Sequence, residues 1–292
     1  MPDAGGLQMS GCALVVEGGG MRGIFSAGVL DAFMEQGFDP FDHYLGVSAG
    51  ACNLSSQVAG QYNRNFRVYT TQMMRPDFIS LGKFLRGGNY MDLDWLWDAF
   101  QREDPLDLDA AARAALTKRF TIVCTSVRTG RAVYLTPTRD TWLDQIKASS
   151  SVPIFYRRSC VIDGERLMDG GVADPLPAQE AIRQGARLVV VVRSRPADYV
   201  KQPGLETTIT SRLLARHREL SKAIRRQPQT YNEAVHGILH PPAGAEVVHI
   251  APTRALRTGR TTQRLEDLHA DYALGRDLGL TAVAQLTPLI GR

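Results

Sequence analysis

The sequence has few cysteines and no long apolar run, and both shortages narrow the class of protein. Its four cysteines are widely spaced, without a CxxC pair or neighbouring histidines: Cys12, Cys52, Cys124 and Cys160. This spacing indicates neither a disulfide framework nor a zinc site, so we expect buried free thiols. The longest aliphatic run, Leu188 to Val192, is far too short to cross a bilayer, and residues 1–12 lack the basic start and apolar core of a signal peptide. These features predict a cytoplasmic protein.

Internal repeats and low-complexity tracts are also absent, which argues against solenoids and disordered tails. With 292 residues, 44% hydrophobic and 22% charged, the chain can bury the core of one large domain, or of one domain with an extension. Residues 1–200 contain 21 Lys and Arg against 22 Asp and Glu, whereas residues 201–292 contain 13 against 8. The net charge of +4 therefore comes entirely from the C-terminal third.

The N-terminal pattern predicts a β-α-β unit. An aliphatic run from Ala13 to Glu17 ends in three glycines, and the apolar residues between Ile24 and Gln36 recur at helical spacing. A second apolar run, Tyr44 to Val47, follows a turn at Pro40. Two strands joined by a helix should be parallel, so the glycine loop and the residue after Val47 meet at the carboxyl edge of the sheet. Open α/β sheets bind their ligands at that edge.

Ser48 follows the second strand in the sequence Gly46-Val47-Ser48-Ala49-Gly50. Because glycine has no Cβ, Gly46 and Gly50 allow a strand and the next helix to pack closely around a sharp turn. Such a turn lifts the serine hydroxyl clear of the sheet, beside the first N–H groups of the helix, as in a nucleophile elbow. The alternative interpretation is a serine that caps an ordinary helix.

Asp169 follows a predicted β-hairpin. Asp163-Gly164 favours a two-residue turn, which places Asp169 at the far end of the second strand, before Gly170 and Gly171. The two glycines permit a tight backbone path and leave the carboxylate unobstructed. An aspartate that merely closes a loop is the alternative.

The remaining pattern predicts further strands and helices. Strands are expected at Thr121 to Thr125, Ala132 to Leu135 and Arg187 to Arg193, and helices at 52–75, Trp142 to Ser150 and Ala178 to Gln184. After Pro196 we expect an extension with helices near 206–226, 228–238 and 262–286 and one strand, Val247 to Ala251.

Three candidates for acyl transfer converge at the predicted sheet edge. That chemistry needs a nucleophile, a base that takes its proton, and donors directed at the oxyanion. Ser48 is the candidate nucleophile, Asp169 the base, and the N–H groups of Gly19 and Gly20 the donors, backed by Arg22 and a helix start. An aspartate with an ordinary pKa of about 3.9 is a poor base at neutral pH. We therefore expect Asp169 to lie close to Ser48 in a dry site.

Three ordered motifs resemble those of the patatin-like phospholipase family: Glu17-Gly18-Gly19-Gly20-Met21-Arg22-Gly23, Gly46-Val47-Ser48-Ala49-Gly50 and Asp169-Gly170-Gly171. The resemblance spans residues 12–195, and residues 196–292 resemble the C-terminal extension of a bacterial branch. It implies a three-layer α/β/α sandwich with a mostly parallel central sheet, and a mostly helical extension packed on it. Residues 148–155 also resemble a family segment, without an assigned role.

The resemblance also implies an activity. Ser48 and Asp169 would form a Ser-Asp dyad that hydrolyses acyl esters of lipids through an acyl-enzyme, without a metal or a cofactor. The oxyanion loop would comprise Gly18, Gly19, Gly20, Arg22 and Gly23. Trp95 and Trp97 either line an acyl-chain pocket or belong to the core.

The sequence leaves three alternatives to a Ser-Asp hydrolase. A Ser-Asp-His triad would take its base from one of the C-terminal histidines, none of which has a supporting motif: His217, His236, His240, His249 and His269. Gly18-x-Gly20-x-x-Gly23 also fits a Rossmann fingerprint, with Asp39 or Asp42 as ribose ligand, but this leaves Ser48 and Asp169 unexplained. A catalytically silent lipid-binding protein is the third, and intact catalytic residues argue against it.

Two basic clusters account for the charge of the C-terminal third: Arg212, Arg216, Arg218, Lys222, Arg225 and Arg226, then Arg254, Arg257, Arg260 and Arg264. One interpretation is transient peripheral contact with anionic membranes, and the other is a solvated or core-bracing face. Without interleaved aromatics or a recognition motif, the clusters do not indicate nucleic-acid binding. The sequence carries no signal for an oligomeric state.

Overall fold

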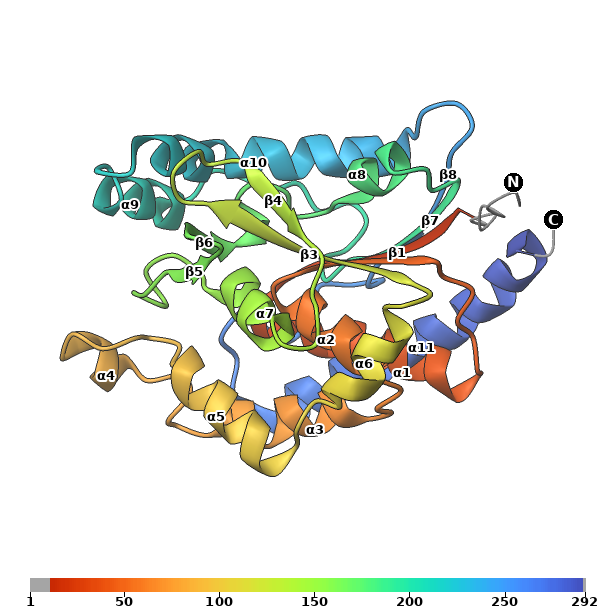
Figure 1. The fold of residues 1–292 in the computed structure, drawn as a ribbon, viewed down its shortest axis with the longest axis horizontal. Helices are drawn as coiled ribbons and strands as arrows, with labels where there is room; N and C mark the ends of the chain where they lie inside the picture. The colour runs from red at the N-terminus through yellow and green to blue at the C-terminus, as the bar shows by residue number, and fades with distance from the viewer. Residues whose placement is uncertain (1–10, 291–292) are drawn as a thin grey trace, which may run out of the picture.

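The computed structural model describes residues 11–290, which fold around one sheet of eight strands (Figure 1). The strands run in the order β5-β6-β3-β2-β1-β7-β8, and β4 pairs with β3. Neighbours among β3, β2, β1, β7 and β8 are parallel, whereas β4, β5 and β6 pair antiparallel. The bounds are β1 (Cys12–Val16), β2 (His43–Val47), β3 (Arg119–Ser126), β4 (Ala132–Leu135), β5 (Cys160–Ile162), β6 (Glu165–Asp169), β7 (Leu188–Val192) and β8 (Glu246–Ile250).

Helices cover both faces of this sheet (Figure 1). On one side lie α8 (Ala178–Arg183), α9 (Leu205–Leu213) and α10 (Arg218–Leu239). On the other lie α1 (Gly23–Glu35), α2 (Ala49–Val58), α3 (Arg64–Thr70), α4 (Leu81–Leu85), α5 (Leu93–Glu103), α6 (Leu108–Ala114), α7 (Trp142–Ser150) and α11 (Leu265–Ile290). Short 3₁₀ turns lie at Gly20–Arg22, Gln72–Met74 and Gly170–Val172. No helix within residues 11–290 combines the length and apolar character needed to cross a membrane. The expected three-layer α/β/α sandwich is confirmed.

The central strand β1 shows why both layers are needed. Successive side chains of a strand point to opposite faces, and every residue of β1 is buried. Leu14 and Val16 belong to the larger apolar core, whereas Ala13 and Val15 belong to a second core. Tyr231 of α10 lies in the second core and Phe25 of α1 in the first. A strand that is apolar on both faces buries all of its side chains only between two helical layers.

The C-terminal part completes the sandwich. Strand β8 extends the sheet by pairing in parallel with β7, and α11 packs closely along α1. A Cβ at Gly28 would lie 2.2 Å from the Tyr272 carbonyl oxygen, and one at Gly275 would lie 2.1 Å from that of Phe25. The two helix backbones therefore approach each other where only glycine fits.

Three helix boundaries differ from those expected. The segment expected to be helical at 206–226 is divided into α9 and α10 by a turn at residues 214–217. The predicted helix at 52–75 is interrupted after α2, near Gly60, which has a φ of +68°. Conversely, α10 continues through Pro228, where a second helix was expected to begin. Pro228 removes one backbone hydrogen bond, at a typical cost of about 3 kcal/mol. Buried side chains on both sides of it, including Ile224 and Tyr231, form one continuous stripe, and its packing offsets that cost.

Candidate active site

The register of β3 brings Ser48 and Asp169 together. Each residue of β3 can pair with one strand on either side. Val123 pairs with β4 on one side and β2 on the other, and Cys124 pairs with β4 on one side and β6 on the other. Strands β2 and β6 therefore lie along the same edge of β3. Val47, the last residue of β2, is opposite Val123, and Asp169, the last residue of β6, is opposite Cys124. The two strands run toward each other and end at adjacent positions. Ser48 therefore leaves the sheet next to Asp169.

Ser48 occupies the strained turn expected of a nucleophile elbow. Its φ of 53° and ψ of −124° lie outside the common regions for a non-glycine residue. A Cβ at Gly46 would lie 2.4 Å from the Ala51 Cα, and one at Gly50 would lie 2.2 Å from the Val16 carbonyl oxygen. Both glycines are therefore required by backbone contacts, as predicted for close packing of a strand and a helix.

The serine-rich end of α7, to which the sequence assigned no role, positions both residues. Ser149 Oγ accepts a hydrogen bond from the Ser48 N–H at 2.8 Å and donates to the Val123 carbonyl at 2.6 Å. The Asp169 N–H donates to the Ser151 carbonyl at 3.1 Å. One segment therefore fixes the backbone of Ser48 and that of Asp169.

The Asp169 carboxylate lies in a dry environment. The residue is 8% exposed, and burial is the main cause that raises its pKa above the ordinary value. Hydrogen bonds from Ser48 and from the Gly171 N–H, the latter 2.8 Å from Oδ1, oppose this increase, as do the positive charges of Arg260 and Lys201. A buried carboxylate with a raised pKa, next to a serine hydroxyl, has the properties of a general base.

The glycine loop lies against Ser48. A Cβ at Gly18 would lie 2.9 Å from the Ser48 Cβ. The Met21 N–H donates to the Arg260 carbonyl, whereas those of Gly19 and Gly20 donate to no group within residues 11–290. The loop thus offers two uncommitted N–H groups near the Ser48 hydroxyl. The Arg22 guanidinium borders Gly19, since a Cβ there would lie 3.3 Å from Nη2. A Cβ at Gly23 would collide with the hydroxyl of a tyrosine, Tyr69.

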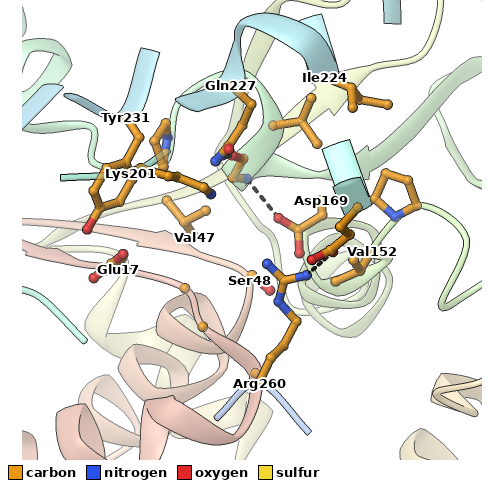
Figure 2. A pocket seen from close by; sticks show the side chains of 18 of the residues that line it. Glu17, Val47, Ser48, Val152, Asp169, Lys201, Ile224, Gln227, Tyr231 and Arg260 are labelled. Atoms are coloured by element: carbon orange, nitrogen blue, oxygen red, sulfur yellow. Dashed lines mark hydrogen bonds and ion pairs between the residues drawn. The ribbon is translucent and has the colours of Figure 1, made fainter. Parts of the chain in front are cut away.

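A polar pocket opens over Ser48 and Asp169 (Figure 2). The glycine loop forms one part of its lining, and the C-terminal part of the chain supplies Lys201, Glu206, Gln227, Tyr231 and Arg260. In Figure 2 the Lys201 and Arg260 side chains both point into this pocket. Neither was predicted as a site residue, because nothing in the sequence links them to Ser48.

An apolar cavity lies on the other side of Ser48. Its lining includes Val68, Met73, Phe78, Leu96 and Trp97. Trp95, the second candidate for such a cavity, does not line it and instead packs near Arg75. The cavity and the polar pocket share Gly20, Ser48, Val152 and Arg260. Ser48 therefore lies where an apolar and a polar compartment meet.

The residues required by two alternative functions lie elsewhere. Within residues 11–290, which include all six histidines, no histidine lines the polar pocket or the apolar cavity. Asp39 and Asp42 precede β2, at the opposite end of that strand from the glycine loop. Asp39 forms an ion pair with Lys118, and Asp42 accepts a hydrogen bond from the Cys12 N–H at 3.2 Å. The geometry thus supports neither a histidine base nor a dinucleotide ribose ligand.

Known proteins resemble this chain over nearly its full length. A family model described as patatin-like phospholipase matches residues 14–182, and one described as a domain of unknown function matches residues 217–291. The uncharacterized protein YjjU of Escherichia coli (strain K12) is 37% identical over 283 residues, covering 95% of this chain and 78% of YjjU. The crystal structure of VipD from Legionella pneumophila has a similar fold, with a TM-score of 0.51, 14% identity, and coverage of 94% of this chain and 67% of VipD. The chain therefore belongs to the patatin-like phospholipase family.

Proposed function

We propose that this protein is a lipid acyl hydrolase in which Ser48 is the nucleophile and Asp169 the general base. The observation that carries the proposal is the meeting of β2 and β6 end to end on β3, which places the Ser48 hydroxyl beside a buried carboxylate. Membership of the patatin-like phospholipase family supports a lipid ester as substrate.

The proposed reaction has two steps, acylation of Ser48 and hydrolysis of the acyl-enzyme. Asp169 takes the hydroxyl proton while Ser48 Oγ attacks the ester carbonyl, and the resulting oxyanion accepts hydrogen bonds from the free N–H groups of Gly19 and Gly20. Collapse returns the proton from Asp169 to the leaving alcohol and forms an acyl-Ser48 ester. Water, deprotonated by Asp169, then attacks that ester, and the acid is released as Ser48 regains its proton. The acyl chain would occupy the apolar cavity lined by Trp97.

The glycine loop provides a direct test of the oxyanion assignment. Gly19→Ala should lower kcat on p-nitrophenyl esters by about 10²-fold, because the new Cβ would lie 2.8 Å from Ser194 Oγ and shift the donors. Gly82→Ala, whose Cβ would make only ordinary contacts at 3.9 Å, is the matched control and should remain active. Calorimetric titration should detect no binding of NAD or NADP. Unchanged kcat in Gly19→Ala, or micromolar dinucleotide affinity, would contradict the assignment.

We further propose that residues 12–195 carry the reacting groups, while residues 196–292 form a mostly helical extension that completes the sheet and closes the polar pocket. The pairing of β8 with β7 and the positions of Lys201 and Arg260 support this division.

Peripheral contact with anionic membranes is part of the proposal, and α9 is its best-supported element. Leu205, Ile209 and Leu213 are 81%, 52% and 64% exposed and recur every four residues, so they form one apolar face. Other residues of α9, among them Thr207 and Thr210, line the polar pocket. An apolar face beside the opening of a lipid hydrolase is well placed to contact a bilayer.

The basic residues divide into two groups. In the second cluster Arg254, Arg260 and Arg264 form ion pairs with acidic residues of the chain. In the first cluster the arginines on α10 and just before it are exposed and form no such pair within residues 11–290: Arg216, Arg218, Arg225 and Arg226. Charge complementarity with an anionic leaflet therefore rests on the first cluster.

Co-sedimentation with phosphatidylglycerol-containing vesicles tests this contact. Binding should increase with anionic lipid content and decrease with salt. Each basic side chain near the surface contributes about 1 kcal/mol, so replacing Arg216, Arg218, Arg225 and Arg226 by Ala should weaken binding more than about tenfold. Replacing Arg102 and Arg113, exposed arginines on α5 and α6, should have little effect. Equal vesicle binding by the fourfold variant would assign these arginines to a solvated face.

A further inference from the structure

The polar pocket contains cations without matching partners. The Lys201 ammonium lies 5.4 Å from the centroid of the Tyr231 ring and forms no ion pair with a carboxylate of residues 11–290. Arg22 is 8% exposed, and its Nε has no hydrogen-bond partner within the same residues. Arg260, the third cation in the lining, pairs with Glu206.

The carboxylates of the same pocket are already engaged. Glu17 Oε2 accepts hydrogen bonds from the Ser194 N–H at 2.6 Å and its Oγ at 3.2 Å. Glu206 pairs with Arg260, and Asp169 accepts hydrogen bonds from Ser48 and Gly171. Arg260 uses only Nη1 in its pair with Glu206, so within residues 11–290 its other guanidinium N–H groups and the Lys201 ammonium are left to bind a ligand.

Hydrogen bonds fix the backbones of Lys201 and Arg260. Asn232 of α10 accepts a hydrogen bond from the Lys201 N–H at 2.8 Å and donates one to the Lys201 carbonyl at 2.9 Å. The Arg260 carbonyl accepts from the Met21 N–H at 3.0 Å, and a Cβ at Gly20 would lie 2.5 Å from that oxygen. The glycine loop and the C-terminal part thus fix the Arg260 backbone beside Ser48. Both cationic side chains therefore extend from fixed backbone positions.

The cations of the polar pocket repel one another. Burial, followed by repulsion from Arg260, lowers the pKa of Lys201 to about 8, with a further contribution from Arg22. Burial also lowers the pKa of Arg22 to about 10, and Arg195 and Arg260 add to the decrease. Glu17 opposes both decreases. An anion bound between the cations would relieve this repulsion.

We propose that Lys201 and Arg260 bind a phosphate group on the alcohol side of the ester, so that these two side chains of the C-terminal part favour substrates with a phosphate at that position. This inference rests on the proposed function, because it takes Ser48 as the point where the scissile carbonyl lies. From there the acyl chain enters the apolar cavity and the glycerol phosphate enters the polar pocket. Charge-assisted hydrogen bonds from Lys and Arg suit phosphate oxygens. The C-terminal part of the chain therefore selects the head group.

Two short-chain lipids with the same acyl groups test the proposal: dihexanoyl-phosphatidylglycerol and 1,2-dihexanoylglycerol. Both are used as monomers, so that contact with a membrane surface does not contribute. Wild-type kcat/KM should favour the phospholipid by about tenfold or more, the effect expected of hydrogen bonds to a charged group. Lys201→Gln and Arg260→Gln should each reduce that preference several-fold. Lys83→Gln on α4, which lines neither the polar pocket nor the apolar cavity, should leave it unchanged.

Binding to Ser48→Ala, measured by calorimetry, separates this inference from the proposed function. The inactive variant should bind the phospholipid more tightly than the diacylglycerol, and Lys201→Gln in the same background should remove the difference. Equal binding of the two lipids would overturn the inference, even if inorganic phosphate alone binds. An equal loss of kcat/KM on both lipids in Lys201→Gln would also overturn it. If wild type hydrolyses neither lipid, the proposed function fails, while the binding comparison still decides the head-group site.

Discussion

Ser48→Ala should abolish ester hydrolysis while the protein remains folded. Loss of the nucleophile in a serine hydrolase typically lowers kcat by at least about 10⁴-fold. The substitution removes only a hydroxyl that hydrogen bonds to Asp169, and the elbow glycines that permit the turn are retained. The measurement is the rate of p-nitrophenyl butyrate hydrolysis, with circular dichroism as the test of folding.

Ser26→Ala is the matched control for this variant. Ser26 is fully buried in α1, its Oγ has no hydrogen-bond partner within residues 11–290, and it lines neither compartment at Ser48. We expect wild-type rates from Ser26→Ala. Substantial hydrolysis by a folded Ser48→Ala would show that another residue is the nucleophile.

Asp169→Asn should have the second largest effect, a loss in kcat of about 10³- to 10⁴-fold. The amide oxygen can still accept the Gly171 N–H, so the local backbone should persist, but the amide cannot take the Ser48 proton. Asp31→Asn is the matched control, since Asp31 is also buried, with a pKa raised to about 6, and lies outside both compartments. It should retain activity.

The pH dependence follows from the sign of the Asp169 pKa shift. Catalysis needs the carboxylate, and burial raises its pKa, so kcat/KM should fall as the pH decreases through a value above the pKa of an ordinary aspartate.

The same pKa shift makes the free energy of unfolding depend on pH. Because the pKa of Asp169 is raised in the folded state, the folded protein binds the proton more tightly than the unfolded chain does. Stability contributed by the protonated form is therefore lost as the pH rises through the folded pKa. At neutral pH, Asp169→Asn should unfold at an equal or higher temperature than wild type.

A histidine base would give the opposite pattern. In that case Asp169→Asn would stay active, whereas replacing one of His217, His236, His240, His249 or His269 would abolish hydrolysis. We expect each of these histidine variants to retain activity, because none of these side chains lines the site.

The parts of the fold that could be predicted are those set by local patterns. The β-α-β unit around Ser48 and the hairpin before Asp169 follow from apolar runs, glycines and the Asp163-Gly164 turn, and both are present. The helix through Pro228 could not be predicted, because its stability depends on buried contacts with residues far away in the chain. Local propensity and tertiary packing disagree at that position, and packing prevails.

The residues of the candidate site likewise include some that the sequence could identify and some that it could not. Ser48, Asp169 and the glycine loop have motifs of their own, so the sequence could identify them. Ser149 lies in a segment that resembles the family, but its role could not be assigned, because that role depends on lying against the Ser48 N–H. Lys201 and Arg260 reach the pocket only through the C-terminal fold. Asn232 of that fold holds the Lys201 backbone, and the Met21 N–H of the glycine loop holds the Arg260 backbone. Sequence alone assigned Arg260 to a surface cluster, whereas the structure turns it toward Ser48.

Labelling with a fluorophosphonate, followed by peptide mapping with mass spectrometry, tests the central claim most directly. The reagent reacts with an activated serine, releasing fluoride and leaving a stable adduct. We expect a single adduct per chain on Ser48, greatly slowed labelling in Asp169→Asn, and none in Ser48→Ala. A folded wild-type protein that takes up no label, as a catalytically silent lipid-binding protein would, or an adduct on another residue would contradict that claim.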